Sequence, residues 1–179
     1  LAEGGNHQGV IAFSAAHEYV SVEEMLGKGD GRLIIICDKI TDPHNLGSII
    51  RCANCVGAAG VIIPKRNGVG LNSVVAKTSA GAIEYTPVAR VTNFAQTIEK
   101  LKANGYWIAG ADMDGESMYS ANLTGKLALV IGSEGEGISK LVKEKCDFIV
   151  NIPMFGEINS LNASIAAAVL MYEVVRQNQ

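Results

Sequence analysis

The feature that most constrains this chain is a series of short apolar segments, most of which lack polar alternation. Segments with helical periodicity lie between most of them. Strands without a polar face are buried on both sides, which is typical of parallel sheets covered by helices. The pattern therefore predicts an α/β fold with a mostly parallel six-stranded sheet and helices on both faces. The six segments are 33–38, 60–64, 85–91, 106–111, 127–132 and 148–153.

Helical patterns fill most of the stretches between these segments. Residues 45–57 carry one apolar stripe, and Arg51 lies on the opposite side of that expected helix. The last helix, expected from Ser160 to Gln177, is apolar almost all round. Such a helix is buried on most faces, so we expect it to pack into the sheet and also to form a subunit interface. Further helices are expected at 72–79, 93–104 and 139–146.

Composition excludes several classes of protein. The 179 residues are 48% hydrophobic and 18% charged, which is a globular composition. No apolar run approaches the roughly 20 residues of a membrane span, and nothing near the start resembles a signal peptide. We expect a cytoplasmic protein. Cys52 and Cys55 form a lone CxxC without the further ligands that zinc requires, so we expect buried thiols and no metal.

The net charge is −3, whereas proteins that bind nucleic acid through phosphate contacts alone are normally basic. RNA binding would have to use local basic patches, a partner chain or a segment that precedes this sequence. The candidate local cations are Arg51, Lys65, Arg66, Lys77 and Arg90.

A glycine-rich stretch, GSEGEG, follows the fifth apolar segment. Gly132 and Gly137 have the spacing of a phosphate-binding P-loop, but Ile138 stands where the lysine is required. Glu134 and Glu136 would also place negative charges where phosphates lie. A nucleotide-binding module is therefore a weak alternative, and an ordinary turn with solvated acids is another. Glycines at the carboxyl end of a strand also let a ligand approach the backbone closely.

Two further polar loops follow apolar segments and can meet at the same edge of the sheet. The first, DPHNLGSIIRCA, contains Asn45 and Arg51, whose ordinary interpretations are a helix-start residue and a solvated charge. In the second, Asn159 or Ser160 is expected to be the N-cap of the last helix. Asn162 would then lie inside an apolar helix, where a buried amide needs hydrogen-bond partners.

Together these segments resemble the three ordered motifs of the SpoU/TrmH family of RNA ribose 2′-O-methyltransferases, which belong to the SPOUT class. The matching stretches are DPHNLGSIIRCA, LVIGSEGEGIS and IPMFGEINSLNASIAAAVLMYE, and the resemblance spans about residues 32–177. It implies a C-terminal trefoil knot, a rare exception to the usual topology rules. It also implies a homodimer, an RNA substrate and S-adenosylmethionine (SAM) as the methyl donor.

The segment NHQGVIA, residues 6–12, is further similar to the linker that precedes the catalytic domain of bacterial 23S rRNA guanosine-2′-O-methyltransferases. The resemblance therefore implies a guanosine of 23S rRNA as the target. Residues 1–31 are expected to be a linker after a missing N-terminal RNA-binding domain, and residues 32–179 to be the methyltransferase domain.

The resemblance assigns catalytic roles to five residues: Asn45, Arg51, Glu134, Ser160 and Asn162. We expect Arg51 to stabilise the developing alkoxide or to bind the adjacent phosphate, since a free guanidinium is protonated at any working pH. Glu134 would orient Arg51, and the remaining three would position the ribose, the cofactor or Arg51.

The expected cofactor-binding residues are Gly132, Ile152 and Leu161 through their backbone groups, together with Ser160 and Asn162. No metal is required, because the sulfonium of SAM already carries a neutral leaving group. Two alternatives within the resemblance stay open: a tRNA ribose 2′-O-methyltransferase of the same family, and a non-catalytic RNA-binding relative.

Overall fold

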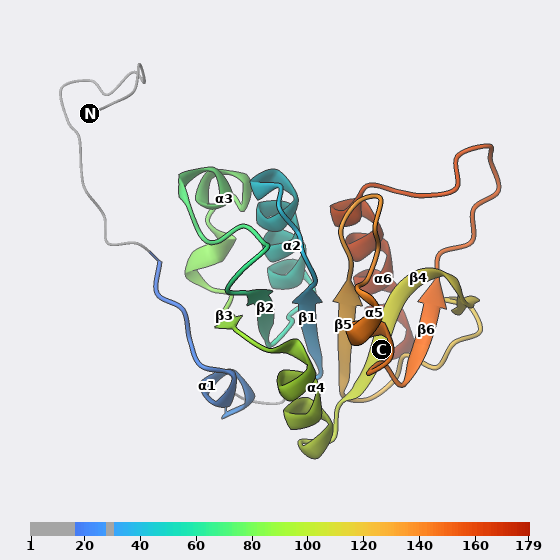
Figure 1. The fold of residues 1–179 in the computed structure, drawn as a ribbon, viewed down its shortest axis with the longest axis horizontal. Coiled ribbons are helices and arrows are strands. Elements are labelled where there is room, and N and C mark those ends of the chain that lie inside the picture. Colours follow the sequence, from blue (N-terminus) through green and yellow to red (C-terminus); the bar gives the residue numbers. More distant parts are fainter. Residues whose placement is uncertain (1–16, 28–30) are drawn as a thin grey trace.

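The computed structural model describes residues 17–27 and 31–179, so the segment 6–12 lies outside the described residues. Its centre is a six-stranded sheet in which every neighbouring pair of strands is parallel (Figure 1). The strand order is β3-β2-β1-β5-β4-β6. All six predicted strands are confirmed: β1 Leu33–Cys37, β2 Gly60–Pro64, β3 Val88–Val91, β4 Trp107–Ser117, β5 Leu127–Ile131 and β6 Phe148–Asn151.

The central strands are apolar because helices cover both of their faces. Every residue of β1 and β5 is buried. Successive side chains of a strand point to opposite faces. Ile34 and Ile36 therefore belong to one hydrophobic core, and Leu33, Ile35 and Cys37 belong to the other. The missing polar alternation in the sequence thus reflects a sheet with a core on each side.

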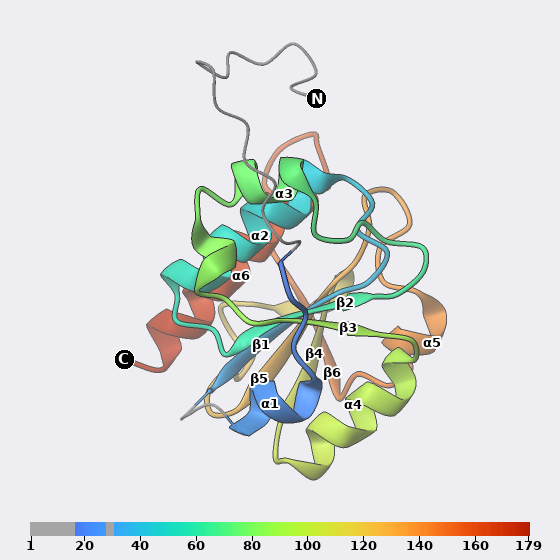
Figure 2. The same cartoon turned by 90° about the vertical axis from the view of Figure 1, so that its left-hand side faces the viewer.

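The helices form two layers, one on each face of the sheet (Figure 2). Three helices and a short 3-10 turn pack on the face that carries Leu33, Ile35 and Cys37. These are α2 (Pro43–Cys55), α3 (Ser73–Thr78), η1 (Ala82–Glu84) and α6 (Ala163–Gln177). The opposite face is covered by α1 (Val22–Gly27), α4 (Phe94–Ala103) and α5 (Lys140–Lys143).

The described part of the segment before residue 32 packs on this domain. It contains the short helix α1, whose Met25 is 1% exposed. Val20 pairs with Ala89 as an isolated parallel bridge beside β3. The packed structure therefore begins before the expected boundary at residue 32. That residues 1–31 link to an RNA-binding domain stays a prediction.

Helix α2 begins at Pro43, two residues before the predicted stretch 45–57, and its apolar stripe faces the core as predicted. Asp42 caps it by accepting a hydrogen bond from the His44 backbone N–H (2.9 Å), and Pro43 occupies the first turn. A Cβ atom on Gly47 would lie 2.7 Å from Thr78 Cβ, so this glycine allows α3 to cross α2 closely. Arg51 is exposed, on the side of α2 away from the core.

Helix α6 begins later than predicted, at Ala163, and its N-cap is Asn162. The expectation that Asn159 or Ser160 caps this helix is therefore wrong. Asn162 is also exposed at the helix start and does not lie inside an apolar helix. The physical reason is that the Asn162 side chain caps the helix and binds two other residues at once, as described below.

Helix α6 packs against α2 and β5, which confirms that it is tucked into the fold. Its inner side is fully buried, with Ala167 and Leu170 at 0% exposure. Its outer side leaves Ile165 52% and Tyr172 55% exposed. The helix is therefore apolar on a side that the described residues do not cover, and the expected subunit interface stays a prediction.

Strand β4 continues past the predicted end at residue 111, with a register shift against β6 between Ala111 and Glu116. The chain then enters a loop, residues 118–126, which the end of α6 holds in place. The side chain of Gln177 accepts from Leu123 N (2.8 Å) and donates to Ala121 O (3.1 Å). We call the hydrogen bonds of Gln177 and Asn178 to this loop the C-terminal latch.

The chain leaves β6 at the sheet edge and returns through a loop to α6, which packs against β5 (Figure 1). This path is consistent with the predicted trefoil knot, whose threading stays a prediction.

The cysteines are unpaired and differ in exposure. Cys37 is fully buried, and burial raises the pKa of its thiol to about 12. Burial likewise raises the pKa of Cys146 to about 11. Cys55 is exposed at the end of α2, so the expectation of buried thiols is wrong there, because the last turn of that helix faces solvent.

In the part of the chain that the structure describes, no three or more His, Cys, Asp or Glu side chains gather where they could hold a metal ion. Within the same residues, every helix is too short or too polar to span a membrane.

Candidate active site

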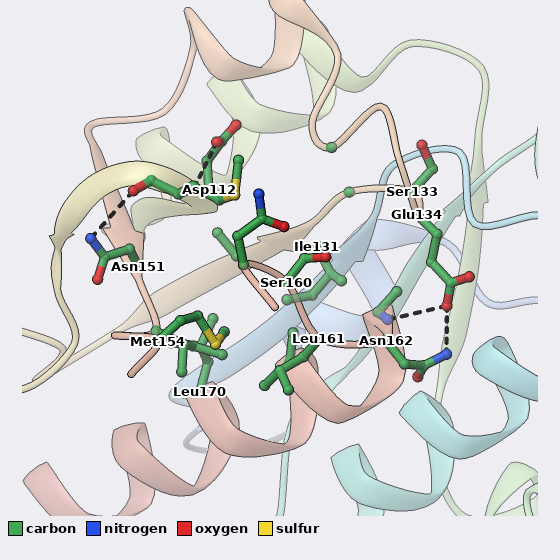
Figure 3. Close-up of a pocket in the computed structure, with 18 of the residues that line it drawn as sticks. Asp112, Ile131, Ser133, Glu134, Asn151, Met154, Ser160, Leu161, Asn162 and Leu170 are labelled. Carbon is green, nitrogen blue, oxygen red and sulfur yellow. Dashed lines mark hydrogen bonds between the residues drawn. The ribbon is translucent and has the colours of Figure 1, made fainter. Parts of the chain in front are cut away.

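A cavity of about 870 Å³ opens where β5 and β6 end and α6 begins, beside the middle of β4 (Figure 3). Small-molecule sites typically span about 300–1,000 Å³ and are mostly apolar with a few placed polar groups. The apolar wall comes from strand ends and from α6. The five residues expected from the sequence to bind a cofactor all line the cavity: Gly132, Ile152, Ser160, Leu161 and Asn162.

The glycine turn forms one wall of this cavity, and its glycines are required by the turn itself. Ser133 and Gly137 exchange two backbone hydrogen bonds, of 3.1 and 3.0 Å. A Cβ atom on Gly132 would lie 2.1 Å from the carbonyl carbon of Gly137, which no side chain could accommodate. Gly135 and Gly137 have positive φ angles of 85° and 68°. The spacing of Gly132 and Gly137, which resembles that of a P-loop, is therefore required by a tight turn closed by backbone hydrogen bonds.

One carboxylate joins the three sequence motifs at the rim of the cavity. Glu134 Oε1 accepts a hydrogen bond from Asn45 Nδ2 (3.0 Å) and another from Asn162 Nδ2. It also accepts from the backbone N–H of Ala163 at 3.4 Å. Asn162 Nδ2 donates in addition to Asn45 Oδ1 (3.0 Å). We call Asn45, Glu134 and Asn162 the amide–carboxylate cluster.

Asn162 takes part in this cluster with one end of its amide and caps α6 with the other. Its Oδ1 accepts from Ser164 N (3.0 Å), Ser164 Oγ (2.7 Å) and Ile165 N (3.3 Å). The negative charge of Glu134 lies at the same helix N-terminus, where the helix dipole stabilises it. The start of α6 is therefore fixed to the glycine turn and to α2.

Arg51 is not part of this cluster. Its side chain is exposed and makes no hydrogen bond or ion pair with any residue that the structure describes. Six residues of α-helix separate it from Asn45, which corresponds to a rise of ~9 Å. The expectation that Glu134 orients Arg51 is therefore not met within one chain, because the Glu134 carboxylate faces Asn45 and Asn162. Ser160 lines the cavity and is exposed.

The charge of the cavity wall is negative. Three carboxylates line it, from Asp112, Glu134 and Glu136, and none of the described residues in its wall is Lys, Arg or His. Lys39 lies 3.4 Å from Glu136, but both side chains are largely exposed and such pairs contribute little. A phosphate would be repelled here, whereas a neutral or cationic ligand would be accepted. This disfavours the nucleotide-binding alternative.

Sequence reasoning missed several residues of the wall. Asp112 directly follows the apolar segment 106–111, and it lies at the same edge of the sheet as the three motifs. Its position after an apolar segment could have identified it from the sequence. Asn151 is the last residue of β6, and Met154 lies three residues further on. Ala166 and Leu170 enter the wall from inside α6, and the apolar sequence there does not distinguish cavity residues from core residues.

A parallel α/β sheet with a glycine turn, an acidic wall and an apolar floor at its carboxyl edge defines an enzyme site for an uncharged or cationic cofactor. Comparison with known proteins gives the family. The model of the SpoU rRNA Methylase family matches residues 32–172, and the chain belongs to this family.

Curated relatives carry matching names. The chain is 52% identical over 179 residues to the Bacillus subtilis protein named putative TrmH family tRNA/rRNA methyltransferase YacO, covering 97% of this chain and 72% of the relative. A Staphylococcus saprophyticus protein named putative TrmH family tRNA/rRNA methyltransferase is 53% identical over 176 residues, covering 96% and 71%. The protein is therefore an RNA methyltransferase of this family, as the sequence predicts.

Solved structures agree with this fold. The SpoU methyltransferase AviRb from Streptomyces viridochromogenes, in complex with AdoMet, superposes with a TM-score of 0.81 at 30% identity, over 88% of this chain and 62% of that one. The TrmH/SpoU tRNA modifying enzyme of A. aeolicus has a TM-score of 0.76 at 27% identity, over 86% of this chain and 79% of that one. The chain thus spans less than two thirds of the AviRb chain. The cofactor expected from the sequence is the one bound in that AviRb complex.

Proposed function

We propose that this protein transfers a methyl group from SAM to a ribose 2′-hydroxyl of RNA, with a guanosine of 23S rRNA as the target. The observation that carries the proposal is the amide–carboxylate cluster. It joins three segments that are distant in sequence, and it does so at the rim of a cavity whose wall suits a cationic cofactor.

The cavity fits SAM by its chemistry. SAM supplies a sulfonium-bound methyl group, and its positive charge is compatible with a wall whose described residues include carboxylates and no cation. The turn at Gly132 exposes backbone at the cavity, where no side chain can intervene. Ile152 and Leu161 contribute apolar surface to the same cavity.

The residues of the chain have distinct roles in this proposal. The amide–carboxylate cluster fixes the reaction end of the cavity, because Glu134 and Asn162 are each held by more than one hydrogen bond. Ser160 presents a hydroxyl beside this end, where it positions the ribose. Arg51 stabilises the alkoxide or binds the adjacent phosphate with its two-pronged guanidinium. Aligning the two reactants provides several kcal/mol of the rate enhancement.

The protein acts as a homodimer in this proposal. The uncovered apolar side of α6, with Ile165 and Tyr172 more than half exposed, supports an interface there. Phe155 and Ile158, in the loop before α6, are apolar side chains that are also exposed, at 90% and 75%. The cytoplasmic location stays a prediction.

Titration calorimetry tests the cofactor, with SAM in one experiment and ATP with magnesium in another. We expect binding of SAM alone. Binding of ATP with magnesium in its place would refute the assignment, and binding of neither would favour the non-catalytic alternative.

A second experiment tests the reaction and the RNA. Labelled methyl transfer from SAM is measured on 23S rRNA and on bulk tRNA, followed by nuclease mapping of the modified ribose. The tRNA alternative has some support, because the relatives' names include both RNAs. We expect Arg51→Ala to abolish methylation while SAM binding is nearly intact. Arg51→Lys should also fail, since lysine lacks the planar fork. Normal turnover by either variant would remove Arg51 from the chemistry.

A further inference from the structure

Asp112 is a carboxylate of the cavity wall that none of the three motifs contains. It directly follows the buried part of β4, and Figure 3 shows it on the side of the cavity opposite Glu134, with Ser160 between them. Its side chain is 23% exposed. Of the three carboxylates in the wall, only Glu134 belongs to the cluster at the reaction end, and Asp112 lies at the opposite end.

The Asp112 carboxylate is held in a fixed orientation by two bonds. Its Oδ2 accepts from Lys143 Nζ at 2.9 Å, and its Oδ1 accepts from the Met113 backbone N–H at 2.7 Å. Lys143 is itself anchored on α5 and also binds Asp114 (2.8 Å). Bonds to Asp114 and Asp112 raise the pKa of Lys143, so this lysine stays charged and keeps Asp112 in place.

Each carboxylate oxygen can accept two hydrogen bonds, and each Asp112 oxygen uses one of its two on the protein. Two acceptor positions are therefore left for a ligand in the cavity. The glycine turn approaches the same group, because a Cβ atom on Gly137 would lie 3.7 Å from Asp112 Oδ2. A ligand group that reaches Asp112 thus lies between β4 and the glycine turn.

The chemistry around Asp112 favours neutral donors over a cation. An ammonium group bound to Asp112 would lie close to the charged Lys143, and two positive charges at that separation repel. Hydroxyl groups do not incur this repulsion, and a pair of adjacent hydroxyls matches the two free acceptor positions. Carboxylates bind ribose hydroxyls in the same way in dinucleotide sites.

We propose that Asp112 accepts hydrogen bonds from the ribose 2′- and 3′-hydroxyls of the methyl donor, and that Lys143 positions it for this contact. This assignment rests on the proposed function. It places the adenosine half of the cofactor between β4 and the glycine turn. The sulfonium then lies toward Glu134, Asn162 and Ser160, at the reaction end of the cavity.

The test compares ligands that share or lack these hydroxyls. The probes are S-adenosylhomocysteine, 5′-methylthioadenosine, which has the ribose but no amino acid, and the 2′-deoxy and 3′-deoxy forms of 5′-methylthioadenosine. Calorimetry measures the Kd of each for the wild type and for Asp112→Ala and Asp112→Asn. Asp114→Asn is the matched control, because Asp114 shares Lys143 but is 69% exposed and lies outside the cavity wall.

We expect the wild type to bind 5′-methylthioadenosine about tenfold or more tightly than either deoxy form, the usual effect of one hydrogen bond to a charged group. Asp112→Ala should bind all three equally, and Asp114→Asn should behave as the wild type. Lys143→Met should reduce the preference for the ribose diol, which a loss of general stability would not do. Thermal melting of each variant checks that it is folded.

Three results would overturn the assignment in distinguishable ways. If Asp112→Ala weakened S-adenosylhomocysteine but not 5′-methylthioadenosine, Asp112 would contact the amino-acid part of the cofactor. If it weakened neither, Asp112 would not contact the cofactor at all. If the wild type bound neither S-adenosylhomocysteine nor SAM, the proposed function would fail, and this assignment with it.

Discussion

Replacing Asn162 by alanine should destabilise the protein, because this one side chain has two separate structural roles. Losing an N-cap costs about 1 kcal/mol. Losing hydrogen bonds to a charged group costs about 1.5–3 kcal/mol when that group is buried, and the exposure of Glu134 places this contribution near the lower limit. The sum is about 2–3 kcal/mol. For a chain of this size it corresponds to a fall in Tm of roughly 5–10 °C.

The variant Asn162→Ser separates the two contributions. A serine keeps an oxygen that can cap α6 but has no amide to bind Asn45 and Glu134, so it should lose about half as much stability as alanine. Both variants are compared with the wild type by thermal melting at one protein concentration. An alanine variant that melts with the wild type would refute the reasoning about the cluster. A serine variant as unstable as alanine would refute the separate capping contribution.

Three other predictions concern different parts of the fold. Gln177→Ala should lower the free energy of unfolding by about 2–3 kcal/mol, because it removes the hydrogen bonds of Gln177 in the C-terminal latch. Gln179→Ala, at an exposed position, should leave the free energy of unfolding unchanged, and urea unfolding measures both variants. Gly132→Ala should abolish SAM binding in calorimetry by opening the glycine turn, while Gly156→Ala, whose Cβ meets nothing within 4 Å, should bind normally. Cys55 should be the first thiol alkylated at pH 8, because burial raises the pKa of Cys37 and of Cys146 and keeps both thiols protonated. Mass spectrometry that found Cys37 or Cys146 modified before Cys55 would contradict this prediction.

Much of the fold could be predicted from the sequence, because the strands are nearly uniform in polarity. Every apolar segment forms a strand, since only a sheet with two covered faces buries such segments completely. The second half of β4 was not predictable in this way. Its sequence, DMDGES, is polar, and it is a strand because it pairs with β6 across a register shift.

The residues of the candidate site could be predicted from the sequence, but the contacts between them could not. The three motifs indicated Asn45, Glu134 and Asn162, and the structure brings these three together. The predicted start of α6 was wrong because the side chains of Ser160 and Asn162 are both able to cap a helix. The choice between them depends on the contacts of Asn162 to Glu134 and Asn45, which local sequence does not contain. The position of Arg51 away from Glu134 likewise depends on the direction of α2 in the fold.

The amide–carboxylate cluster also determines when the site can form during folding. Its hydrogen bonds join Asn45 to Glu134 across 89 positions of the chain and to Asn162 across 117. Contacts of such long range form only after large loops have closed, so they are slow to form and belong to the last stages of folding. A collapsed intermediate can contain β1, β2 and α2 while the cavity is still absent. Binding of the cofactor therefore reports that the whole domain has folded, and its rate of appearance during refolding would measure the final step.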